Sequence, residues 1–134
     1  MKQLKKILLI DDDASINFLH SEVLKHYTIS ANYELMDSSK AAMEAIQNSK
    51  AQELPDLILL DLNMPVFNGW DFLDEMSVQI EAIQKIPTVI LTSSVNPDDI
   101  EQSKGYTNVI GFLSKPLDVE ELTELMKLYR ASTT

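Results

Sequence analysis

Four short runs of this sequence are apolar almost throughout, and each run ends in polar residues. They are KKILLI before Asp11, LILL before Asp61, TVIL before Thr92 and VIGFL before Ser114. Continuous apolar runs of this length are typical of strands that are covered on both faces, as in a parallel sheet. A fifth segment, YELMDS from Tyr33, alternates and is more polar, which predicts an edge strand.

Between these runs, apolar residues recur at helical spacing. The four expected helices carry Ile16, Leu19, Val23, Leu24 and Tyr27; Ala42, Ala45 and Ile46; Leu73, Met76, Ile80 and Ile83; and Leu122, Leu125, Met126 and Tyr129. Another helix is expected after Asn96, with Pro97 in its first turn. It has few apolar residues and should be the least firmly anchored. The alternation predicts an α/β fold with a doubly wound sheet and helices on both faces.

Length, charge and composition exclude several classes of function. The chain has 134 residues, which suits one domain over residues 1–134. It carries 21 acidic and 11 basic residues, a net charge of -10, which disfavours binding to nucleic acid or to an anionic membrane. The absence of cysteine excludes disulfides and thiolate catalysis. The sequence contains no membrane-length apolar run, and we expect a cytoplasmic protein.

Polar residues follow the predicted strands. They are Asp11, Asp12, Asp13, Asp61, Thr92, Ser93, Ser114 and Lys115. In a parallel sheet these side chains meet at one edge, where such sheets bind ligands. Carboxylates this close raise one another's pKa unless a cation neutralises them, and Mg²⁺ suits a site with few carboxylates and a phosphate. A lysine and a hydroxyl beside a nucleophilic carboxylate are suited to phosphoryl transfer.

Together, these segments resemble the receiver domains of two-component response regulators, of the chemotaxis-regulator-like, stand-alone type. The matching segments are ILLIDDD, LILLDLNMPVFNGWDFL, TVILTSS and GFLSKPL, in that order and over nearly the whole chain. The resemblance implies a flavodoxin-like fold with strand order 2-1-3-4-5. It also implies that Asp61 accepts a phosphoryl group from a histidine kinase or a phosphotransfer protein.

The resemblance further implies a magnesium site and an anion-binding lysine. Asp11, Asp12 and Asp61 would hold Mg²⁺, with Asp11 acting mainly through water, and Asn63 would add its backbone carbonyl. Lys115 would pair with the phosphoryl oxygens. The bond from Lys115 to Pro116 is a candidate for the cis form, because X-Pro bonds alone have a small cis penalty.

A switch is implied as well. Thr92 would turn to hydrogen-bond the phosphoryl group, and Phe112 would then move inward and alter the surface of the last two helices and the fifth strand. The side chains of Asn63 and Ser94 are expected to tune the lifetime of the phosphoryl group. The signal would leave through contact with an unknown downstream protein, from a monomer or weak dimer.

Several neighbouring residues have simpler interpretations. For Asp13, a helix N-cap is favoured over a metal ligand, and Asp118 with Glu121 resembles a capping box. His20 and His26 are expected on or near the first helix, away from the strand-end edge, without a catalytic role. Trp70 is expected to be a packing residue.

Two other functions remain open at this point. The run DDDAS from Asp11 also fits a haloacid-dehalogenase-like phosphohydrolase, in which Asp11 would be the nucleophile and Asp61 would have no role. A receiver fold could also act as a docking module that is independent of phosphorylation. The favoured prediction is a signalling switch that catalyses its own phosphorylation and dephosphorylation, and not a metabolic enzyme.

Overall fold

The chain forms one five-stranded parallel sheet in the order β2-β1-β3-β4-β5, as predicted. A computed structural model describes residues 4–27, 29–93 and 95–133. Its elements are β1 (Leu4–Ile10), α1 (Ala14–His26), β2 (Ser30–Met36), α2 (Ser39–Gln47), the 3₁₀ turn η1 (Ala51–Glu53), β3 (Leu57–Asp61), α3 (Gly69–Met76), α4 (Glu81–Gln84), β4 (Thr88–Thr92), α5 (Pro97–Ser103), β5 (Val109–Ser114) and α6 (Val119–Ser132). The more polar β2 is an edge strand, also as predicted.

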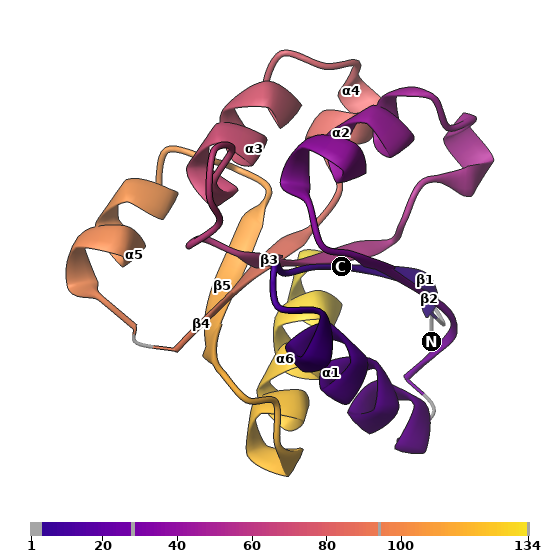
Figure 1. Ribbon diagram of the computed structural model, residues 1–134, viewed down its shortest axis with the longest axis vertical. Helices are drawn as coiled ribbons and strands as arrows, with labels where there is room; N and C mark the ends of the chain where they lie inside the picture. Colours follow the sequence, from indigo (N-terminus) through magenta and orange to yellow (C-terminus); the bar gives the residue numbers. More distant parts are fainter. Residues whose placement is uncertain (1–3, 28, 94, 134) are drawn as a thin grey trace.

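The sheet separates two layers of helices (Figure 1). Helices α1 and α6 cover one face, and α2, α3 and α4 lie on the other. Successive residues of a strand point to opposite faces, so a strand covered on both sides needs apolar residues at every position. The face toward α2 and α3 takes Leu8, Ile10, Ile58, Leu60 and Ile90, and the face toward α1 and α6 takes Ile7, Leu9, Leu57, Leu59, Val89 and Leu91.

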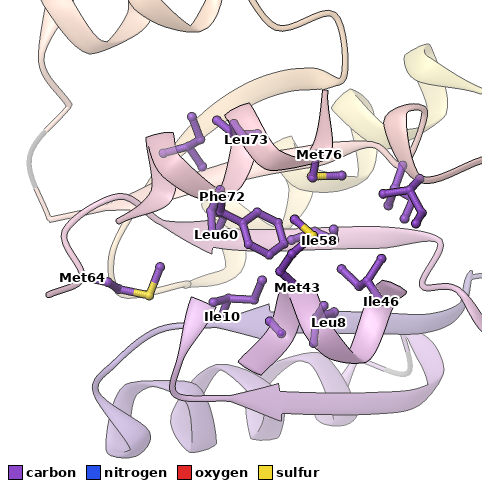
Figure 2. Close-up of a cluster of buried hydrophobic side chains, with 14 of the residues drawn as sticks. Leu8, Ile10, Met43, Ile46, Ile58, Leu60, Met64, Phe72, Leu73 and Met76 are labelled. Carbon is purple, nitrogen blue, oxygen red and sulfur yellow. The ribbon is translucent and has the colours of Figure 1, made fainter. Parts of the chain in front are cut away.

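The core between the sheet and α2 and α3 is built around one aromatic ring (Figure 2). Phe72 of α3 is fully buried and lies among Leu60, Ile10 and Met43. Fully burying a side chain of this kind contributes about 1.5–3 kcal/mol. This packing holds α3 against the strand that ends in Asp61.

Helix α1 buries only part of the face that its apolar spacing predicts: Leu24 is fully buried, and Val23 packs against the same core. Leu19 and Tyr27, expected to face the core, are each 46% exposed, whereas Asn17, His20 and Ser21 are buried. The prediction was therefore wrong for Leu19 and Tyr27, and it missed the buried polar residues of this helix. The buried polar side chains are compensated by hydrogen bonds: for example, Asn17 Nδ2 donates to the backbone carbonyls of Asp11 and Met36, at 3.0 Å each.

The single helix expected through Leu73, Met76, Ile80 and Ile83 was also wrong. Helix α3 ends at Met76, and the four-residue α4 begins at Glu81. Ser77 Oγ donates to the carbonyl of Asp74 at 2.6 Å, one of the local hydrogen bonds by which serine competes with helix continuation. Ile80 is extended and 67% exposed, so it does not continue the apolar stripe.

The predicted helix starts are confirmed except at α6, where Asp118 accepts the N–H of Glu121 at 2.9 Å but the Glu121 carboxylate accepts from Ser114, so the expected capping box is half formed. Asp13 caps α1, accepting from the N–H groups of Ser15 at 3.0 Å and Ile16 at 3.2 Å. Asn96 caps α5 with Pro97 in the first turn, and Ser103 is the one buried residue of this helix in the described chain, as expected for a weakly anchored element. Among the described residues, none of the helices combines the length and apolar character needed to cross a membrane.

Candidate phosphoryl-accepting site

The carboxyl end of β1 presents one buried and one exposed aspartate. Asp11 is buried, and its backbone N–H donates to the carbonyl of Met36 at 3.1 Å, continuing the pairing of β1 with β2. Its Oδ1 accepts a hydrogen bond from the N–H of Asp13 at 2.9 Å. Asp12 is exposed. Residues 11 and 12 thus place one fixed and one solvent-facing carboxylate at the same edge.

The carboxyl end of β3 brings a third carboxylate to this edge. Asp61 is buried, and its Oδ1 accepts a hydrogen bond from the N–H of Asn63 at 3.2 Å. The carboxylates of Asp11, Asp12 and Asp61 each offer an oxygen within 4.8 Å of the others. The sequence prediction that these three side chains lie together is therefore confirmed by the geometry.

Lys115 reaches into this cluster from the end of β5. Its ammonium forms an ion pair with Oδ2 of Asp11 and a second with Oδ1 of Asp61, at 3.3 Å from the latter. The backbone N–H of Lys115 donates to the carbonyl of Thr92 at 2.8 Å. The bond from Lys115 to Pro116 is cis, the isomer considered from the sequence. Two carboxylates thus share one cation.

Burial and charge act in opposite directions on these groups. Burial raises the pKa of the Asp61 carboxyl, which the hydrogen bond from Asn63 opposes; the charge of Asp11 raises it further, and Lys115 lowers it. Burial alone would lower the pKa of Lys115, but the carboxylates of Asp11 and Asp61 outweigh it and raise that pKa. The lysine is therefore held as a cation between the two aspartates.

The donor set fits a hard divalent cation. Three carboxylates lie close together, and among the described residues a single ammonium, that of Lys115, compensates their negative charge. Oδ2 of Asp11 is a buried oxygen that receives no hydrogen bond of suitable geometry, and its charged neighbour is Lys115. Oxygen ligands of this type are those that Mg²⁺ prefers.

An open pocket of about 540 Å³ surrounds the cluster. Its polar lining includes Asp61, Lys115, Asn63 and the exposed Ser93. Its apolar lining comes from Ile16 and Leu19 of α1 and from Pro116. The unexpected exposure of Leu19 thus places an apolar side chain at the rim of the site.

The remaining predicted residues lie as follows. Thr92 is buried at the end of β4, paired with Ser114 of β5, and Ser94 lies outside the described residues. Phe112 is half-buried and packs against the cluster on the α2 and α3 face, together with Trp70 and Tyr106.

Trp70 has the packing role that was expected. Its ring stacks on that of Tyr106, with centroids 5.9 Å apart, and the Tyr106 hydroxyl donates to Asp74. Burial and the charge of Asp74 raise the pKa of Tyr106 to about 12, so this hydroxyl keeps its proton at neutral pH. The contact joins α3 to the segment before β5.

Two residues beside the site were missed from the sequence. Asn17 fixes the backbone of Asp11 from α1. His20 accepts a hydrogen bond at Nε2 from the N–H of Leu117, 3.2 Å away, so the expectation that His20 lies away from this edge was wrong. The sequence signal for both is the same: polar side chains three residues apart, in a helix whose buried face needs partners on the sheet.

Comparisons with known proteins agree with this geometry. The family model for the response regulator receiver domain matches residues 7–127. Response regulator Rcp1 of Synechocystis is 35% identical over 126 residues, covering 92% of this chain and 84% of the relative. Sporulation initiation phosphotransferase F of Bacillus subtilis is 30% identical over 125 residues, covering 93% of each.

A solved structure shows the same likeness in three dimensions. A two component response regulator from Cytophaga hutchinsonii has a TM-score of 0.87 and 27% identity, with 97% of this chain and 99% of that chain covered. The residues that the family model matches include every strand end that contributes to the pocket.

Proposed function

We propose a function for this chain from its family: it belongs to the response regulator receiver domains of two-component systems. The proposal is that Asp61 accepts a phosphoryl group from a histidine kinase or a phosphotransfer protein. The observation that carries the proposal is the juxtaposition of Asp61, a carboxylate pair and Lys115 in one open pocket. In this step an oxygen of Asp61 forms a bond to phosphorus while the bond from phosphorus to the donor's imidazole nitrogen breaks. The electron pair stays on the imidazole, which takes up a proton.

Lys115 and the metal ligands support this chemistry. Lys115 lies within 3.3 Å of Asp61 and can compensate charge on a phosphoryl group attached there. Asp11, Asp12 and Asp61, with the backbone carbonyl of Asn63, would hold Mg²⁺. The ion would supply positive charge that neutralises both the carboxylates and the phosphoryl oxygens.

The signal is proposed to leave through protein contact. Thr92 would hydrogen-bond the phosphoryl group, and the half-buried Phe112 would change its packing beside Trp70 and Tyr106. Phenylalanine has no hydroxyl, so this change acts by packing alone. Residues 1–134 are proposed to act as a single receiver domain, a cytoplasmic monomer or weak dimer that binds proteins and not nucleic acid or membranes.

The test is intact mass after incubation with acetyl phosphate and Mg²⁺. We expect one added phosphoryl group on the wild type, none on Asp61→Asn, and none without Mg²⁺. A phosphohydrolase with Asp11 as nucleophile would instead lose its reaction in Asp11→Asn and keep it in Asp61→Asn. A receiver already known to be phosphorylated serves as a positive control for the donor and the buffer.

If the wild type stays unmodified, the next measurement is binding of beryllofluoride, which mimics a phosphoryl group without being hydrolysed. Binding of beryllofluoride to the wild type and not to Asp61→Asn would indicate rapid dephosphorylation. Failure of both measurements would overturn the proposal in favour of a docking module that is independent of phosphorylation.

A further inference from the structure

His20 lies on the buried face of α1 and contacts the segment that carries Lys115. It is 1% exposed, and its Nε2 accepts the N–H of Leu117 at 3.2 Å. Leu117 lies two residues after Lys115 and is itself buried. A buried backbone N–H without a partner is costly, so this acceptor is needed for the segment to stay where it is.

Each backbone N–H group of residues 114–117 has a hydrogen-bond acceptor. The N–H of Ser114 donates to Oε2 of Glu121 in α6 at 3.1 Å, and the N–H of Lys115 donates to the carbonyl of Thr92 at 2.8 Å. Proline has no N–H. The N–H of Leu117 is therefore the next donor, and Nε2 of His20 accepts its hydrogen bond. Strand β4, helix α6 and helix α1 thus each fix one point of the chain around the lysine.

We propose that His20 is a positioning residue for the phosphoryl-accepting site, holding the backbone after Lys115 so that the ammonium reaches Asp11 and Asp61. The inference rests on the function proposed above. Asn17, one turn earlier on the same face, holds the backbone of Asp11. One face of α1 therefore positions both the lysine and its acidic partner.

This role requires a neutral imidazole. A neutral histidine can accept at Nε2, whereas the protonated form has only donors and would face the Leu117 N–H without an acceptor. The charged groups that act on His20 are Asp11, just after β1, and Lys115, just after β5. Burial lowers the pKa of His20, Asp11 opposes this, and Lys115 lowers the pKa further. The hydrogen bond is therefore present at neutral pH and lost as the pH falls toward the lowered pKa.

Three variants separate positioning from packing. His20→Gln keeps an acceptor oxygen near the place of Nε2, and His20→Leu keeps much of the volume but removes the acceptor. His26→Gln is the matched control, because His26 is exposed near the end of the same helix. The first measurement is NMR of the backbone amides of Leu117 and Lys115 in the full chain. We expect both resonances to be close to wild type in His20→Gln and His26→Gln, and shifted with faster amide exchange in His20→Leu.

The second measurement is the initial rate of phosphorylation by acetyl phosphate with Mg²⁺. We expect about a tenfold loss in His20→Leu, equivalent to about 1.4 kcal/mol in the barrier, and near wild-type rates in the other two variants. The ratio of the wild-type rate to the His20→Gln rate should fall as the pH is lowered toward the lowered pKa of His20, since only the wild type can be protonated at this position.

Each result supports or overturns the inference. Wild-type amide resonances and rates in His20→Leu would overturn it, as would a rate ratio that stays constant over the pH range in which His20 becomes protonated. If His20→Leu does not fold, the inference is still tested by the pH dependence of the rate ratio and by the amide resonance of Leu117 in His20→Gln. If the wild type neither becomes phosphorylated nor binds beryllofluoride, the proposed function fails, whereas the Leu117 and Lys115 amides still show whether His20 orders the segment.

Discussion

At the level of single residues, Val66 is the strained position of the loop that follows Asp61. Its φ is 68°, and it is the one non-glycine residue with positive φ in the described part of the chain. The N–H of Phe67 donates to the carbonyl of Pro65 at 2.8 Å, which closes a three-residue turn around Val66. A β-branched residue is a rare occupant of this region. Its side chain is fully exposed, so no burial compensates the strain.

Replacing Val66 with glycine should therefore stabilise the protein. We expect the free energy of unfolding to rise by about 1 kcal/mol, because glycine adopts positive φ without a steric penalty. The measurement is urea denaturation. Val78→Gly is the matched control: Val78 is 73% exposed at an ordinary φ, and there glycine should lower stability through the entropy of the unfolded chain. Changes of the same sign in both variants would contradict the prediction.

At the level of elements, the start of α3 is packed directly against the strand end that carries Asp61. A Cβ on Gly69 would lie 2.7 Å from the carbonyl oxygen of Asp61 and 2.8 Å from Cα of Leu62. The Gly69 N–H also donates to the Leu62 carbonyl at 3.0 Å. Because both crowded atoms belong to the backbone, they cannot move aside as a side chain would. The helix can approach this closely only with glycine at that position.

Gly69→Ala should accordingly destabilise the fold. We expect a loss of about 1–3 kcal/mol in the free energy of unfolding, the usual cost of forcing a methyl group into a packed region. Thermal or urea denaturation measures it. Gly105→Ala provides the comparison, since the nearest atom to its Cβ is 3.5 Å away and its φ is not positive. A loss in Gly105→Ala as large as that in Gly69→Ala would show that the close contact is not the cause.

At the level of the whole molecule, negative charge dominates. The formal net charge is -10, and three carboxylates converge at the carboxyl edge of the sheet. Burial raises the pKa of Asp61, which means that its charged form is disfavoured there. A cation that binds the folded state alone relieves this cost and stabilises the protein by mass action.

Mg²⁺ should therefore raise the Tm, and its removal with a chelator should reverse the change. At a free concentration about a hundred times Kd, the gain is about 2.7 kcal/mol. Sodium chloride at equal ionic strength controls for general screening of the net charge. The exposed Asp12 allows a test that spares the core: Asp12→Ala should lose most of the gain.

Asp13→Asn provides the matched control for the Mg²⁺ test. It removes an adjacent charge but keeps a side-chain acceptor for the cap of α1, and it should retain the gain. An equal gain from Mg²⁺ in the wild type and in Asp12→Ala would argue against the proposed ligand set.

The sequence by itself determined the sheet and the place of the site. Strands buried on both faces need apolar residues at every position, and this pattern is visible along the chain. The carboxyl ends of parallel strands share one edge, so Asp61, Asp11 and Lys115 could be placed together before any coordinates. Helix starts such as Asp13 and Asn96 were also predictable, because an N-cap satisfies donors of its own helix.

Only the tertiary structure decided which faces the helices bury and where they end. Apolar spacing indicates which side chains are costly to expose, but it carries no information about which polar side chains find hydrogen-bond partners on neighbouring elements. In α1, the carbonyl of Asp11 and the N–H of Leu117 favoured burial of Asn17 and His20, and Leu19 was left at the rim. Leu117 lies 97 positions from His20, and Met36, the second partner of Asn17, lies 19 positions from it, so the positioning of the site by α1 could be seen only once the chain was folded.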